Sequence, residues 1–62
     1  MEAVDTIIDY AMPTMKAERA LKELHEAALR QDFDSAIVKA TEAVVESRMA
    51  LNSLRIMQER AA

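Results

Sequence analysis

Apolar residues recur at helical spacing along two stretches of the chain. The first stretch runs from Thr14 to Arg30, and the residues of its stripe are Ala17, Leu21, Leu24 and Ala28. The second runs from about Phe33 to Arg60 without a glycine or proline, and its stripe consists of Ile37, Ala40, Val44, Ser47, Leu51 and Leu54, flanked by Ala36, Ala43, Ala50 and Met57. Spacings of three and four residues predict two helices, over residues 14–30 and 33–60, whose stripes face each other.

The segment Gln31-Asp32-Phe33-Asp34 separates the two stripes. Asp32 is a favourable N-cap, and Asp34 adds negative charge to the first turn of the following helix. A connection this short joins antiparallel neighbours, so we expect an all-α antiparallel helical hairpin. We also expect Asp32 and Phe33 to form a latch, with Asp32 as the cap and Phe33 as an apolar cover at the end of the bundle.

The first stripe continues backwards as far as Ala3, so residues 1–12 are predicted to form a short N-terminal helical or frayed segment. Pro13 lacks an N–H group and disfavours helical geometry at Met12. We therefore expect the helix either to kink at Pro13 or to begin there, with the proline at its first position.

A second apolar stripe on the second helix cannot be covered by the hairpin partner as well. It comprises Val38, Val45, Met49 and Ile56, with Asn52 among them. A helix whose apolar surface is wider than one face is covered from two sides. We expect a second copy of the chain to cover this stripe, which gives a four-helix-bundle homodimer; a helix of another protein is the alternative. Asn52 either fixes the register of that interface or is a simple surface residue.

Size and composition favour association. The chain has 62 residues, no cysteine and one histidine, and small domains usually need disulfides, a metal or oligomerisation. Glycine is absent and aromatic residues are few, as is typical of an all-α protein. Because no run of 15 to 20 apolar residues could serve as a signal peptide or membrane span, we expect a cytoplasmic protein without a membrane partner.

The candidate chemistry is sparse. His25 has no second histidine or cysteine at ligand spacing, and neither Ser47 nor Ser53 has a neighbouring base, so we expect no metal, no cofactor and no catalytic residue. A net charge of −3 argues against a general affinity for nucleic acid. Arg48 and Arg55, seven residues apart on one helix face, are the candidate nucleic-acid contacts.

Two parts of the chain resemble known families. The run Leu29–Ile37 resembles the inter-helix turn of a tetratricopeptide repeat, an acidic turn with an aromatic residue followed by an Ala-Ile pair; a single copy implies a hairpin and not a peptide groove. In size and format the chain is similar to the small plasmid-encoded RNA-binding hairpins that dimerise. The stretch Ser35–Leu51 resembles short helical dimer proteins of the lambdoid phage exo–xis region.

The phage resemblance implies an accessory protein that contacts a host protein and modulates host physiology or the lysis–lysogeny choice. It carries over no functional residue. Together with the stripes, it predicts a small non-enzymatic regulatory or adaptor protein that acts through protein–protein association. The rival hypothesis is a Rop-like RNA- or DNA-binding helical bundle that uses Arg48 and Arg55.

Overall fold

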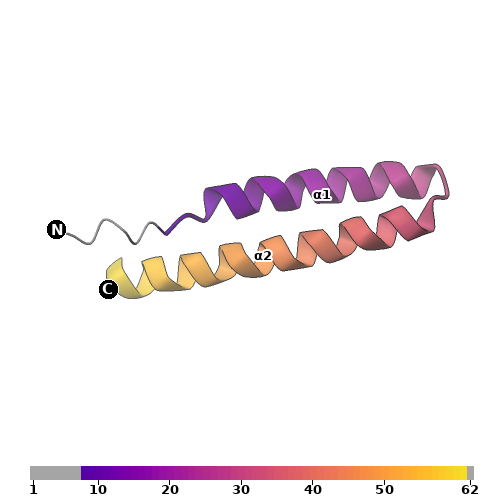
Figure 1. The fold of residues 1–62 in the computed structure, drawn as a ribbon. Coiled ribbons are helices and arrows are strands. Elements are labelled where there is room, and N and C mark those ends of the chain that lie inside the picture. Colours follow the sequence, from indigo (N-terminus) through magenta and orange to yellow (C-terminus); the bar gives the residue numbers. More distant parts are fainter. Residues whose placement is uncertain (1–7, 62) are drawn as a thin grey trace.

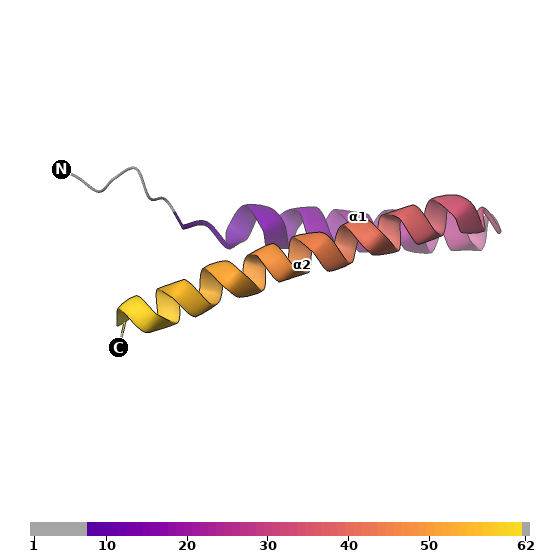
Figure 2. The same cartoon turned by 60° about the horizontal axis from the view of Figure 1, so that its bottom comes forward.

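The chain folds into two antiparallel helices, which confirms the predicted all-α hairpin (Figure 1). The computed structural model describes residues 8–61. Helix α1 spans Ala11–Leu29 and helix α2 spans Phe33–Ala61, with Arg30-Gln31-Asp32 between them. At 29 residues, α2 is longer than α1, which has 19, and it extends past the start of α1 in both views (Figures 1 and 2).

Helix α1 begins two residues before its proline. Residues 1–7 of the expected N-terminal segment lie outside the described part of the chain. The Ala11 N–H donates a hydrogen bond of 2.8 Å to Asp9 Oδ1. Pro13 therefore falls inside the first turn, where backbone N–H groups have no partner within the helix, so its missing N–H costs no hydrogen bond. The helix begins at Ala11 and not at the proline.

Helix α1 ends in a Schellman motif, in which two backbone N–H groups beyond the helix donate to carbonyls of its last turn. The Asp32 N–H donates to the Ala27 carbonyl and the Gln31 N–H donates to the Ala28 carbonyl, each at 2.9 Å. Gln31 has a φ of 61°, in the left-handed region that favours glycine. The chain thus reverses while the carbonyls at the end of α1 remain satisfied.

Asp32 closes the turn on its other side by capping α2. Its Oδ1 accepts a hydrogen bond of 3.3 Å from the Ser35 N–H, and its carbonyl accepts one of 3.0 Å from the Ala36 N–H. The side-chain and backbone hydrogen bonds from Ser35 lower the pKa of Asp32, which keeps the carboxylate charged at the positive end of the helix dipole. Phe33, the second residue of the expected latch, is 61% exposed.

The two helices pack against each other through small side chains. Among the described residues, the buried ones are alanines and one proline: Pro13, Ala17, Ala20 and Ala27 on α1, and Ala43 and Ala50 on α2. We call this set the alanine seam. The distance between packed helix axes depends on the side chains at the contact, and alanine allows a close approach.

The prediction that the two apolar stripes face each other holds only in part: Ala17 of the first stripe is buried, but the larger members of both stripes lie at the surface. Leu21, Val44 and Leu51 are 53%, 51% and 46% exposed, whereas Ala43 and Ala50 point toward α1. The spacing correctly groups residues that share a helix side, but one neighbouring helix covers only part of a broad apolar surface. The close packing of the alanine seam determines which part is covered.

Replacing Gln31 with glycine should stabilise the turn. A side chain in the left-handed region costs energy that glycine avoids, and part of the gain is cancelled by the greater entropy of glycine in the unfolded chain. We expect Gln31→Gly to raise the free energy of unfolding by about 0.5–1 kcal/mol, measured by urea denaturation at fixed protein concentration. Gln31→Ala, which keeps the Cβ atom, should show little change; an equal gain in both variants would contradict this account.

Candidate association surfaces

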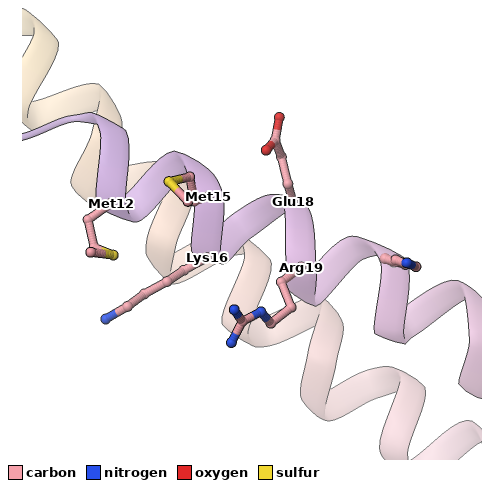
Figure 3. A pocket seen from close by; sticks show the side chains of 6 residues that line it. Met12, Met15, Lys16, Glu18 and Arg19 are labelled. Carbon is pink, nitrogen blue, oxygen red and sulfur yellow. The ribbon is translucent and has the colours of Figure 1, made fainter.

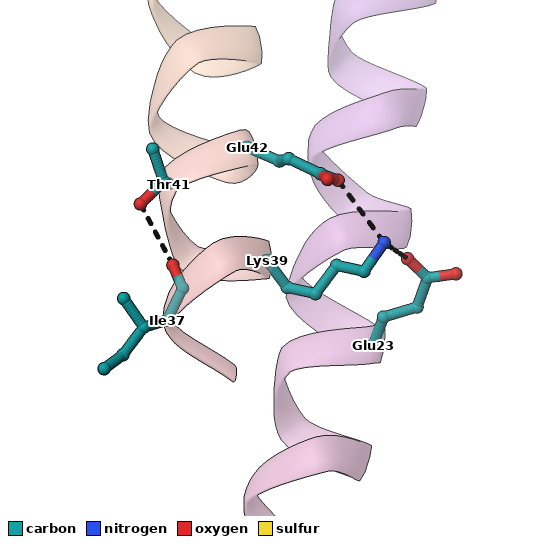
Figure 4. A network of polar contacts seen from close by, with 5 residues as sticks. All are labelled: Glu23, Ile37, Lys39, Thr41 and Glu42. Atoms are coloured by element: carbon teal, nitrogen blue, oxygen red, sulfur yellow. Dashed lines mark hydrogen bonds and ion pairs between the residues drawn. The ribbon is translucent and has the colours of Figure 1, made fainter. Parts of the chain in front are cut away.

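One side of the alanine seam is charged. Lys39 of α2 reaches across to α1, where its Nζ lies 3.1 Å from Glu23 Oε1, and it is 3.6 Å from Glu42 Oε1 on its own helix (Figure 4). The two carboxylates raise the pKa of Lys39, Glu23 having the larger effect. Lys16, Arg19 and Glu46 line the same hollow of about 320 Å³. These partly exposed ion pairs favour a solvent-facing side of the hairpin and contribute little to stability.

The other side of the seam is an apolar groove of about 480 Å³. Leu21 and Leu24 line it from α1, and Val44 and Leu51 line it from α2, with Ala40 and Ala43 at its base. The larger residues of the two predicted stripes therefore lie side by side on one surface of the hairpin, where they continue beyond the groove by helical periodicity, while Ala17 is buried in the alanine seam. We call this surface the groove face; it consists of Leu21, Leu24, Ala28, Ile37, Ala40, Val44, Ser47, Leu51 and Leu54.

The predicted interface on α2 forms a separate surface, which we call the outer stripe. Its members are all exposed, Val38 at 56%, Val45 at 49%, Met49 at 50% and Ile56 at 42%, together with Asn52. Helical periodicity places them away from the groove face, so the adjacent residues Val44 and Val45 belong to different surfaces.

One end of the outer stripe approaches α1. Met49 and Ile56 line a hollow of about 340 Å³ together with Met12 and Pro13, close to the start of α1. The outer stripe is therefore not confined to one helix, and α1 supplies a methionine to its apolar surface. Methionine packs adaptably against varied partners.

Arg48 and Arg55 lie at the border between the two apolar surfaces. Both are exposed, and Arg48 also lines the groove. Their spacing of seven residues keeps them on one side of α2. The candidate nucleic-acid contacts are thus brought to one side of the hairpin, next to the groove face.

A further cluster on α1 does not converge on a common point. Met12, Met15, Lys16, Glu18 and Arg19 border an open hollow of about 440 Å³, together with Lys22 (Figure 3). Glu18 points in the opposite direction from Lys16 and Arg19 (Figure 3). Because all of these residues come from a single helix and their charged groups diverge, this hollow provides no set of groups that could hold one ligand.

The described residues offer few groups that could bind a metal ion. They contain no cluster of three or more metal-ligating side chains, and His25 is exposed on α1. Neither α1 nor α2 combines the length and the apolar character that a membrane-spanning helix requires. Comparison with protein-family models, curated proteins and solved structures found no match to this chain.

The spacing of the alanines in the sequence is a signal for the alanine seam, and it thereby indicates which larger residues form the groove face. Ala36, Ala43 and Ala50 are seven residues apart, and so are Ala20 and Ala27. Small residues at this interval can form the contact line of two closely packed helices. Assigning the alanines to the seam leaves the larger residues beside them on the surface.

Enlarging the alanine seam should separate the helices. Ala20 is 2% exposed, and a leucine at this position would have no space between α1 and α2. We expect Ala20→Leu to lower the free energy of unfolding by about 1–3 kcal/mol in denaturant titrations. The control is Ala11→Leu at the exposed start of α1, which should change it little; equal tolerance of both substitutions would show that the seam is not closely packed.

Proposed function

We propose that this chain is a small non-enzymatic adaptor or regulatory protein that acts by protein–protein association, and that its working form is a homodimeric four-helix bundle. One observation carries the proposal. Fifteen large apolar side chains are between 38% and 71% exposed, while the buried positions described above hold only alanine and proline. Isolated exposed apolar residues are ordinary, but contiguous apolar patches indicate interaction sites.

The energetics of a single hairpin support association. Complete burial of a leucine, valine or isoleucine side chain stabilises a fold by about 1.5–3 kcal/mol, whereas fixing the backbone of each residue costs about 1–2 kcal/mol. Folded domains meet this cost with two packed layers of secondary structure around a core. The hairpin supplies one layer, and a second layer would bury the leucines and valines that it leaves exposed.

Two distinct surfaces suit a regulatory or adaptor protein. The groove face and the outer stripe are both apolar, so one can hold the protein together while the other binds a partner. Binding in this way needs no reactive group, in keeping with a non-enzymatic role. The finer proposal, a phage accessory protein that binds a host protein, is supported only by the resemblance of Ser35–Leu51 to the exo–xis proteins.

Folding should depend on protein concentration. We expect sedimentation equilibrium at micromolar concentration to give twice the chain mass of 7.0 kDa, and the thermal midpoint of the helical circular dichroism signal to rise on concentration. A cooperative, fully helical monomer with a midpoint independent of concentration would contradict the homodimer.

A second candidate is a Rop-like nucleic-acid-binding bundle, which the exposed Arg48 and Arg55 on one side of α2 favour. A two-fold dimer would double this patch. Titration of labelled RNA hairpins and duplex DNA at two salt concentrations tests it, because phosphate contacts make affinity fall steeply with salt. Such binding, lost in Arg48→Ala and Arg55→Ala, would favour this candidate over the protein adaptor.

A further inference from the structure

We propose that the second copy docks on the groove face, and that the outer stripe remains outside the dimer contact. The inference rests on the proposed homodimer and specifies its surface. Both surfaces are apolar and similarly exposed, so exposure by itself does not decide between them. The arrangement of the two helices does.

The alanine seam has one charged side and one apolar side. Stacking a second hairpin on the charged side would bury Lys39, Glu23 and their neighbours, and the desolvation of buried ion pairs is costly. On the opposite side the groove is lined by leucine, valine and alanine, with Ser47 and Arg48 as its polar members. A second layer therefore fits the groove face.

The groove face also uses both helices. A copy docked on the outer stripe would contact α2 and only the start of α1 near Met12, and it would leave Leu21 and Leu24 of α1 in water. A copy docked on the groove face covers the exposed stripes of α1 and α2 together. Each helix then packs against one helix of its own chain and one of the partner, which is the arrangement of a four-helix bundle.

The size of the groove face matches a stable interface. The 19 residues of α1 make a helix about 28 Å long, and two helices side by side are about 20 Å wide, so the face covers roughly 550 Å² in projection. The accessible area of a ridged surface exceeds its projection and approaches the ~800 Å² that each partner buries in a standard interface. Leu21 and Leu51 are about half exposed on this face, and the groove over Ala40 and Ala43 can receive apolar side chains of the second copy.

Two neighbouring valines provide a matched test. Val44 lies on the groove face at 51% exposure and Val45 on the outer stripe at 49%, so the two positions are matched in residue type and in exposure within one hairpin. In the dimer, Val44→Glu places a carboxylate inside the contact in each copy, beside Arg48, whereas Val45→Glu leaves it in water. We expect Val44→Glu to weaken dimerisation more than about 100-fold in sedimentation equilibrium, and Val45→Glu to leave both mass and helicity unchanged.

Val44→Glu unfolds the chain if folding depends on dimerisation, so a gentler pair of variants tests the same inference. The chain has no cysteine, so Val44→Cys and Val45→Cys each carry one thiol that a maleimide can label. Under conditions in which both variants sediment as folded dimers, we expect labelling to be more than tenfold slower in Val44→Cys.

The possible results separate the inference from the proposed function. Protection of the thiol in Val45→Cys, with rapid labelling of Val44→Cys, would place the dimer contact on the outer stripe and overturn the inference while the homodimer stands. Equal labelling rates in a folded dimer would also overturn it. A folded monomer in both variants and in the parent chain would overturn the homodimer itself.

Discussion

The burial of alanines from both helices is the constraint on which the rest of the structure depends. Alanine brings α1 and α2 together without a large side chain between them, so the hairpin closes with little apolar burial. The leucines, valines and isoleucines that flank the seam are therefore displaced to the surface. Their arrangement into one broad face and one outer stripe follows from the rotation of each helix that the alanines select.

The sequence was sufficient to predict the helices and their turn, because their signals are local. Asp32 caps α2 through a hydrogen bond to a residue three positions away, and the acidic turn separates two clear helical periods. The start of α1 was less well predicted, since a proline is tolerated throughout the first turn and Asp9 supports an earlier start.

The rotation of the helices could not be predicted in the same way. Leu21 and Val44 are large apolar members of the predicted stripes, and hydrophobicity alone places them between the helices. Helix packing responds to shape as well, and Ala20 and Ala43 allow a closer approach than any larger residue. The candidate surfaces consist of the residues that remain exposed once the alanines pack between the helices. Which residues form them therefore depends on a tertiary contact that periodicity does not encode.

A single layer of two helices also affects how long such a protein would persist in a cell. If a second copy supplies the missing layer, dilution both separates the copies and unfolds each of them, since neither retains a core of its own. Unfolded chains are the substrates of cellular proteases. The concentration of the protein would then determine its rate of degradation. A high concentration would keep the chain dimeric and protected from proteases, and a fall in synthesis would be followed by rapid degradation.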